Sequence, residues 1–274
     1  MCGIAGFVGY PNKSRSVLTR MLDCIVHRGP NSAGIHIDGP LAMGMRRLSI
    51  IDLSGGDQPI SNASGTIWTV SNGEIYNFRE VRSELQQRGY RFRTDSDTEV
   101  IVHAYEHWGE SFVDHLEGMF GTALWDNRQQ KLLLLRDRLG IKPLYYAPME
   151  PGLAFGSEMK SIFAGGFIDP KVDEVALEDY LAFGFATAPR TIAKGVSKLA
   201  PGEMLVWKNG RSKLHKYWKL SGKTRSSPAT VEQTFSELQN AVTSHLVSDV
   251  PLGAFLSGGV DSSGIVGIMD DSIT

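Results

Sequence analysis

The sequence is poor in cysteine: only Cys2 and Cys24 occur among its 274 residues. Two thiols are too few for the disulfide framework that stabilises many small secreted domains. The start of the chain also lacks the basic region and the apolar region that together mark a secretory signal. These absences predict a protein of a reducing compartment, and we expect a cytoplasmic location.

The chain also lacks a charge excess and long apolar segments. Its formal net charge is −2, with lysine and arginine scattered along the whole length, so no basic surface for nucleic acid or an anionic membrane is expected. No apolar run approaches the roughly 18 residues that a membrane-spanning helix requires. We therefore expect no nucleic-acid partner and no membrane partner.

What the sequence does have is a thiol at its second position, in Met1-Cys2-Gly3. Removal of the initiator methionine would place an amine of pKa about 7.7–8.0 and a thiol of pKa about 8.5 on one residue. The amine could then take the thiol proton, directly or through one water, as in an N-terminal nucleophile. The alternative is that Cys2 is a small buried apolar residue near the start of a strand.

A second motif lies near the other end, where an apolar run from Val250 leads into Ser257-Gly-Gly-Val-Asp261-Ser262. The pattern predicts a buried strand, a glycine turn and a helix start, whose N–H groups and hydroxyls can surround a phosphate. No lysine follows the glycines, which excludes the common nucleotide triphosphatase loop. An ordinary serine-glycine turn would leave Asp261 unexplained. The motif resembles the pyrophosphate loop of ATP pyrophosphatases.

Length and composition allow one full domain and part of another, with 42% hydrophobic residues. The apolar spacing predicts strands and helices that do not alternate regularly, which favours an α+β layered domain. Strands are expected at residues 3–9, 66–70, 121–125, 131–135, 144–147 and 153–155. Helices are expected at residues 17–25, 78–85 and 100–108.

A predicted hairpin closes this first domain. Residues 208–211, Lys-Asn-Gly-Arg, lie between apolar arms that run from residue 205 to 218, and Asn-Gly in this setting indicates a type I′ turn. The serine-rich residues 221–230 are the predicted linker. We expect a first domain of residues 2–220.

The remaining residues, 221–274, form a second domain that is only begun. A helix is expected from Thr230, with Gln233 in the capping-box position. One strand at residues 253–256 and one helix from Ser262 cannot make a parallel sheet, because parallel strands need crossover connections and covering helices.

Together, these features resemble the glutamine-hydrolysing asparagine synthetases, whose first part is a class II amidotransferase. The resemblance covers nearly the whole chain. It rests on Cys2-Gly-Ile-Ala-Gly, His27-Arg-Gly-Pro, Arg47-Leu-Ser-Ile-Ile-Asp, Ser71-Asn-Gly-Glu-Ile-Tyr-Asn, Ser96-Asp-Thr-Glu, Arg136-Asp-Arg-Leu-Gly-Ile-Lys-Pro-Leu-Tyr-Tyr and the Ser257 loop. It implies a four-layer αββα N-terminal-nucleophile (Ntn) hydrolase domain with antiparallel sheets, followed by the incomplete start of an α/β ATP-pyrophosphatase domain.

The resemblance also implies roles in glutamine hydrolysis. Attack by the Cys2 thiolate on the side-chain amide creates an oxyanion, and Asn72 with the N–H of Gly73 match the family's oxyanion hole. The substrate's α-carboxylate and α-ammonium need partners of opposite charge. The resemblance assigns the rest of the glutamine site to Arg47 for the carboxylate, Glu74 and Asp97 for the ammonium, and Ile50.

His27 also invites a catalytic interpretation, because cysteine and histidine often form a nucleophile and base. The α-amino group already supplies a base, so we expect His27 and Arg28 to shape the pocket rather than to carry protons. No protein-held metal site is expected, and the glutaminase step needs no cofactor.

For the second site, the resemblance implies ATP, with Mg²⁺ as the partner of its phosphates. The matching residues are Leu256, Ser257, Gly258, Gly259, Asp261 and Ser262. In the complete family, ATP activates the side-chain carboxylate of aspartate and ammonia from the first site attacks it. We expect this chain to perform at most the glutaminase half.

Two alternatives stay open. The ammonia could serve another carboxylate acceptor, or the chain could be a catalytically silent truncated remnant that associates with a full-length partner. Relatives that form β-lactams have lost the nucleophile, so an intact Cys2 with Asn72 and Asp97 weighs against that branch. Amidotransferases that act on sugar phosphates or phosphoribosyl pyrophosphate lack the pyrophosphate loop. The resemblance is compatible with a homodimer.

Overall fold

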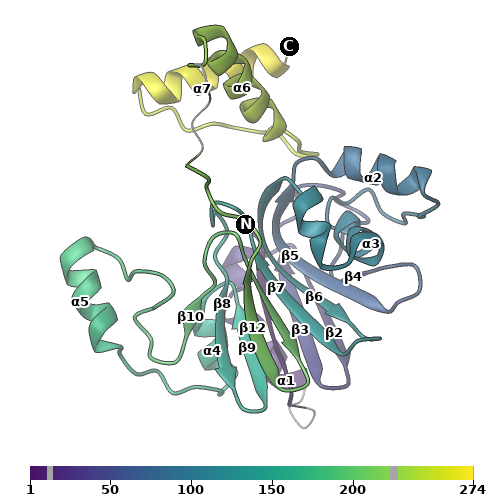
Figure 1. The fold of residues 1–274 in the computed structure, drawn as a ribbon, viewed down its shortest axis with the longest axis vertical. Helices are drawn as coiled ribbons and strands as arrows, with labels where there is room; N and C mark the ends of the chain where they lie inside the picture. The colour runs from purple at the N-terminus through teal and green to yellow at the C-terminus, as the bar shows by residue number, and fades with distance from the viewer. Residues whose placement is uncertain (11–14, 223–227, 274) are drawn as a thin grey trace.

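The protein is described by a computed structural model that covers residues 1–10, 15–222 and 228–273. Within these residues, two six-stranded sheets form the body of the molecule (Figure 1). Every pairing between neighbouring strands is antiparallel. The antiparallel sheets and the irregular mixture with helices confirm the predicted α+β class.

The first sheet has the strand order β10-β8-β9-β1-β3-β2. Its strands are β1 (Gly3–Val8), β2 (Ser32–Asp38), β3 (Leu41–Arg47), β8 (Tyr145–Met149), β9 (Gly152–Gly156) and β10 (Ser197–Lys198). In the register of β1 and β3, Gly3 lies opposite Arg46. Because these strands are antiparallel, Cys2 and Arg47 lie side by side at the same end of the sheet.

The second sheet has the order β12-β11-β7-β6-β5-β4. Its strands are β4 (Ile60–Ser61), β5 (Ile67–Ile75), β6 (Gly118–Asp126), β7 (Lys131–Arg136), β11 (Glu203–Lys208) and β12 (Arg211–Lys216). The predicted hairpin is confirmed between β11 and β12. Its two turn residues, Asn209 and Gly210, have φ angles of 51° and 77°, and a type I′ turn requires positive values at both positions.

Helices cover the outer face of each sheet, and the two inner faces pack on each other. The helices of the body are α1 (Arg15–Asp23), α2 (Phe78–Gln87), α3 (Glu99–Trp108) and α4 (Met159–Ala164), with short 3₁₀ turns η1 (Val26–Arg28) and η2 (Gly109–His115). Apolar side chains of α1 and α4 pack on the first sheet, and those of α2 and α3 pack on the second. A third cluster, which includes Met45 and Trp125, lies between the sheets. This order confirms the four-layer αββα fold.

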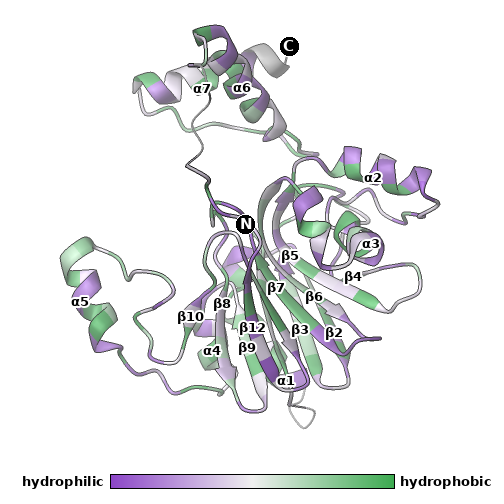
Figure 2. Ribbon diagram, in the orientation of Figure 1, coloured by the Kyte–Doolittle hydropathy of each residue, from purple (hydrophilic) through white to green (hydrophobic). Residues whose placement is uncertain are grey.

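Helix α5 (Glu174–Phe183) stands away from the two sheets (Figure 1). Apolar residues follow the inner strands, as expected for a core, but they also occur on α5 (Figure 2). Leu181, Phe183 and the neighbouring Phe185 are exposed to solvent over more than half of their surface. All described helices are too short or too polar to cross a membrane.

The last part of the chain contains α6 (Val231–Ser244) and α7 (Val260–Ile273), which lie above the body in Figure 1. The predicted capping box is present. The side chain of Thr230 accepts from the N–H of Gln233, and the side chain of Gln233 accepts from the N–H of Thr230, both at 3.2 Å. The sequence signal for this helix start is therefore confirmed.

The strand expected at residues 253–256 is wrong. These residues have no strand conformation and their side chains are exposed; the exposed fraction is 105% for Phe255 and 60% for Leu256. An apolar run becomes a strand only when a neighbouring backbone pairs with it, and no described segment does so. In the predicted linker, residues 223–227 lie outside the described residues and the others have no regular structure. The domain boundary at residue 220 stays a prediction.

Candidate active site

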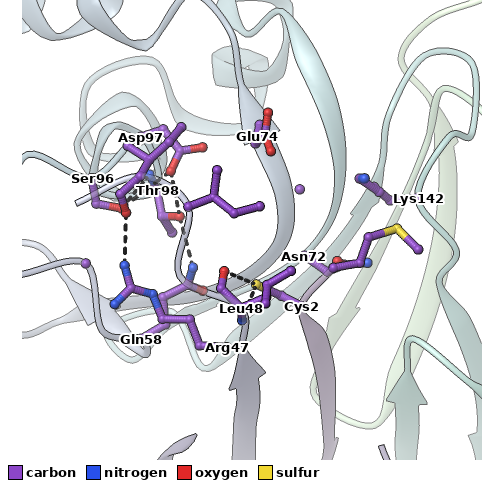
Figure 3. Close-up of a pocket in the computed structure, with 15 residues that line it drawn as sticks. Cys2, Arg47, Leu48, Gln58, Asn72, Glu74, Ser96, Asp97, Thr98 and Lys142 are labelled. Carbon is purple, nitrogen blue, oxygen red and sulfur yellow. Dashed lines mark hydrogen bonds between the residues drawn. The ribbon is translucent and has the colours of Figure 1, made fainter. Parts of the chain in front are cut away.

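One pocket near the ends of β1, β3 and β5 contains all the residues that the sequence assigned to glutamine (Figure 3). The predicted members of its lining are Cys2, Arg47, Ile50, Asn72, Gly73, Glu74 and Asp97. They come from the N-terminus, from both sheets and from the turn before α3. The packing of the two sheets is therefore what brings them together.

The thiol of Cys2 is held by the backbone of Leu48, the residue that follows β3. The N–H of Leu48 donates to Sγ at 3.3 Å, and the S–H lies 3.5 Å from the carbonyl oxygen of the same residue. Burial raises the pKa of this thiol, while the Leu48 hydrogen bond, the N-terminal amine and Arg47 act in the opposite direction. Because burial favours the neutral thiol, the thiolate forms only when a base is close enough to take the proton.

The surroundings of the first two residues agree with a nucleophile fixed by its backbone. Met1 lines the pocket, and burial lowers the pKa of its amino group. Nε of Arg28 donates to the carbonyl oxygen of Cys2 at 2.9 Å. His27 instead pairs with Glu158 at 2.8 Å, and among the described residues no hydrogen bond joins His27 to Cys2. Arg28 therefore positions the cysteine, and His27 lies outside proton-transfer contact with it.

Asn72 and Gly73 lie within β5 and face the pocket from the second sheet. The side chain of Asn72 is completely buried, yet neither its Nδ2 nor its Oδ1 has a hydrogen-bond partner among the described residues. A Cβ on Gly73 would lie 1.9 Å from the carbonyl oxygen of Met119 on β6, so only glycine fits there. A buried amide without a hydrogen-bond partner destabilises the folded protein. In the wall of a pocket, such an amide indicates a donor that is free to bind a ligand.

Arg47 supplies a cation to the pocket, and its guanidinium is buried at the end of β3. Nη2 donates to the carbonyl oxygens of Ile51 at 2.9 Å and Asp52 at 2.6 Å. Nη1 donates to the carboxylate oxygen Oδ1 of Asp57 at 3.0 Å. These bonds use three of its five N–H groups. The guanidinium is thus fixed in place, and its charge faces the cavity.

Glu74 and Asp97 are the anions of the pocket, and Figure 3 places them on the side opposite Arg47. The N–H of Ile75 donates to Oδ2 of Asp97 at 2.9 Å. Burial raises the pKa of both carboxyls, and the charge of Asp97 raises that of Glu74 further, while Lys142 opposes it. The ionised forms of two neighbouring carboxyls, of which Asp97 is buried and Glu74 is partly buried, are stabilised by a cation between them.

The pocket also contains residues to which the sequence assigned no role: Leu48, Ile51, Gly56, Gln58, Ser96, Thr98 and Lys142. Gln58 joins two walls, because its Nε2 donates to Oγ1 of Thr98 at 3.0 Å and its Oε1 accepts from the N–H of Ser71 at 2.7 Å. Lys142 is buried, and burial lowers its pKa. Lys142 belongs to the Arg136 motif of the sequence analysis, so its place near the site could have been predicted. Gln58 belongs to none of those motifs, and nothing in the sequence indicated its role.

The residues assigned to ATP lie elsewhere, directly before α7 and in its first turn, and none of them lines this pocket. Oγ of Ser257 and Oγ of Ser262 are 2.9 Å apart, and Gly258 has a φ of 80°, a value typical of glycine. Hydroxyls at a helix N-terminus suit a phosphate. Leu256 and Val260 are exposed beside them. Among the described residues no group of histidine, cysteine and carboxylate side chains could hold a metal ion.

The four-layer fold occurs in a solved amidotransferase. The glutamine phosphoribosylpyrophosphate amidotransferase of B. subtilis matches with a TM-score of 0.60, over 99% of this chain and 64% of that chain, at 17% sequence identity. A match at this identity establishes the fold alone. The chain therefore shares the four-layer αββα fold of that amidotransferase, as the resemblance implied.

The sequence defines the family within this class. The chain belongs to the glutamine amidotransferase domain family, which matches residues 1–218, and residues 234–273 match the asparagine synthase family. Two relatives from Bacillus subtilis (strain 168), the glutamine-hydrolysing asparagine synthetases 3 and 1, are 38% and 39% identical over 98% and 97% of this chain. The chain spans 45% and 44% of their lengths. The predicted resemblance is confirmed.

Proposed function

We propose that this chain hydrolyses the side-chain amide of glutamine, with Cys2 as the nucleophile, as the glutaminase half of an asparagine synthetase. The Cys2 sulfur attacks the amide carbon, the C–N bond breaks, and the nitrogen leaves with a proton as ammonia. Water then cleaves the resulting thioester, which releases glutamate and restores the thiol.

The single observation that carries the proposal is the unpaired amide of Asn72 in the pocket of the Cys2 thiol. The tetrahedral intermediate places a negative charge on the former carbonyl oxygen, and an amide donor fixed in advance stabilises that charge. We assign the N–H of Gly73 as the second donor. The cost of leaving Asn72 unpaired in the free protein is recovered when the oxyanion forms.

The charges around the pocket support free glutamine as the substrate. Arg47 would bind the α-carboxylate, while Glu74 and Asp97 would bind the α-ammonium. Ile50 contributes apolar wall beside them. A peptide-bound glutamine has neither charge, so the site would reject it because buried charges would be left unpaired.

The base in this proposal is the amino group of Cys2 itself, after Met1 has been removed. In the structure the chain's amino group belongs to Met1, and burial lowers its pKa. A lowered pKa favours the unprotonated amine, which is the state that accepts the thiol proton.

We extend the proposal to the longer relatives' activity as follows. Residues 2–220 form the glutaminase domain, and residues 221–274 contribute the pyrophosphate loop to an ATP- and Mg²⁺-dependent synthetase that amidates aspartate. We propose the cytoplasm as its compartment, and a homodimer as the assembly to test by light scattering. The glutaminase half needs neither ATP nor a metal.

The test is hydrolysis of glutamine by the purified chain, measured as glutamate and ammonia. The Cys2→Ala variant should be inactive. Cys24→Ala is the matched control, because Cys24 is the only other cysteine and does not line the pocket; this variant should keep its activity. An inactive parent chain with correctly removed Met1 would instead favour the catalytically silent remnant.

A further inference from the structure

A short segment of the second part of the chain contacts residues of the first part that lie in or next to the wall of the glutamine pocket. We call residues 245–249, which follow α6, the clasp. The ring centroid of His245 lies 4.1 Å from that of Tyr76, which directly follows the end of β5 and is two residues beyond Glu74. Val247 packs against the apolar cluster beneath α2 and α3. The clasp therefore touches the first domain through several side chains.

The strongest contacts of the clasp are made by Asp249. Its carboxylate oxygen Oδ2 accepts from the N–H of Asp52 at 2.6 Å, and its own N–H donates to the carbonyl oxygen of Ile50 at 2.9 Å. Asp52 and Asp249, which the first of these bonds joins, are 197 positions apart in the sequence. One residue of the second part thus binds both ends of the Ile50–Asp52 turn.

The same turn holds the guanidinium of Arg47. The carbonyl oxygens of Ile51 and Asp52 accept from Nη2 of Arg47. The Asp52 carboxylate also accepts from the N–H of Asp95 at 2.9 Å, at the start of the segment that carries Asp97. The turn is therefore connected to both charged walls of the pocket.

We propose that Asp249 is a positioning residue for glutamine, which acts through the Ile50–Asp52 turn on Arg47. The inference rests on the proposed function, because it assigns the α-carboxylate of glutamine to Arg47. It adds a physical link between the two parts of the chain. When the second part moves and carries the clasp with it, the affinity of the first part for glutamine changes. Asp249 touches no substrate atom in this scheme.

The variants separate the hydrogen bond from the charge. Asp249→Ala removes the acceptor and should raise the KM for glutamine about two- to tenfold, the effect of one modest hydrogen bond, with kcat nearly unchanged. Asp249→Asn keeps an acceptor oxygen and should stay within about twofold of the parent. Glu237→Ala is the matched control, because Glu237 is an exposed acid of α6 whose side chain has no hydrogen bond or ion pair with any residue that the structure describes.

Two further measurements distinguish positioning from general damage. Alkylation of Cys2 by iodoacetamide, a neutral reagent that does not need Arg47, should keep its rate in Asp249→Ala. Hydrogen exchange of the Asp52 amide should be faster in Asp249→Ala only. An unchanged KM in Asp249→Ala, or a KM equally raised in Glu237→Ala, would overturn the inference. If the parent chain neither hydrolyses nor binds glutamine, the proposed function itself has failed.

Discussion

The backbone N–H of Leu48 points at the sulfur of Cys2 from 3.3 Å. Leu48 directly follows Arg47, so the residue that anchors the thiol is covalently joined to the residue assigned to the substrate carboxylate. The pairing of β1 with β3 holds both at one end of the first sheet. A sheet is a rigid frame, and the separation between nucleophile and carboxylate site is therefore set before glutamine binds.

We expect the active form of the protein to begin at Cys2. Retention of Met1 leaves the thiol without an amine on its own residue and leaves the Met1 side chain in the pocket lining. Intact-mass analysis of active and inactive fractions checks this. Full activity in protein that retains Met1 would show that another group is the base.

Asn72→Ala should lower kcat for glutamine about 100- to 1,000-fold, as for loss of an oxyanion donor. It should not lower the free energy of unfolding, because the amide that it removes has no partner among the described residues. Asn62→Ala is the matched control. Asn62 is equally buried, but its Oδ1 accepts from the N–H groups of Thr66 and Ile67. This control should lose stability and keep kcat, as judged by thermal unfolding and steady-state kinetics.

Arg47→Ala and Asp97→Ala should each weaken glutamine binding by several-fold to a few hundred-fold, the ~1–3 kcal/mol of a charge-assisted hydrogen bond. Truncated substrates make the assignment specific. The parent should bind 4-aminobutanamide, which lacks the α-carboxylate, more weakly than glutamine. Arg47→Ala should lose this preference and keep the preference for substrates that carry the ammonium. Asp97→Ala should lose discrimination against glutaramic acid, which lacks the ammonium. Equal losses for both analogues in both variants would contradict the assignment.

Glutamine binding should weaken as the pH falls below neutrality. Burial raises the pKa of Asp97, and burial together with Asp97 raises that of Glu74. A raised carboxyl pKa means that protons bind at higher pH, and a protonated carboxyl no longer attracts an ammonium. Bound glutamine favours the ionised forms, so binding should release protons at pH values where the carboxyls of the free pocket begin to protonate, which lie above the ordinary carboxyl range of about pH 4. Calorimetry of Cys2→Ala in two buffers measures this release, which should shrink in the additional variant Glu74→Gln; proton uptake would be the opposite sign.

Much of the fold was predictable because its signals are local. The 3.6-residue spacing of Val17, Leu18, Met21 and Leu22 on α1 and the Asn209-Gly210 turn depend only on neighbours in sequence. Strand β3 was missed because Leu41–Arg47 is buried on both faces and contains no β-branched residue, so it shows neither alternation nor a strand composition. The strand predicted at residues 253–256 does not form. Strand formation depends on pairing with another segment, which the local sequence does not report.

The pocket divides in the same way. Cys2, Asn72 and Arg47 could be found from the sequence because they lie in motifs whose chemistry is recognisable. Gln58 could not, because its function is to bridge Ser71 and Thr98, which approach it only after folding. The contact of Asp249 with the Ile50–Asp52 turn likewise joins distant parts of the chain, and no spacing rule reports such a contact.

The last prediction concerns the pyrophosphate loop. The purified 274-residue chain should hydrolyse glutamine at a rate independent of ATP and aspartate, and it should not bind Mg-ATP tightly. A phosphate loop binds well only when a sheet and adjoining loops hold its N–H groups. Here the residues before Ser257 form no strand, and Phe255, Leu256 and Val260 are exposed around it.

Isothermal titration with Mg-ATP and an assay for asparagine and pyrophosphate test this prediction together. Ser257→Ala is a useful control, because it removes one of the two hydroxyls that meet at the N-terminus of α7. It should change neither the titration nor glutamine hydrolysis. Tight binding that Ser257→Ala abolishes, or sustained aspartate-dependent release of pyrophosphate, would show that the loop is held by contacts other than a paired strand. In that case the exposed residues 253–256 must become ordered when the nucleotide binds, and hydrogen exchange at their amides would slow on its addition.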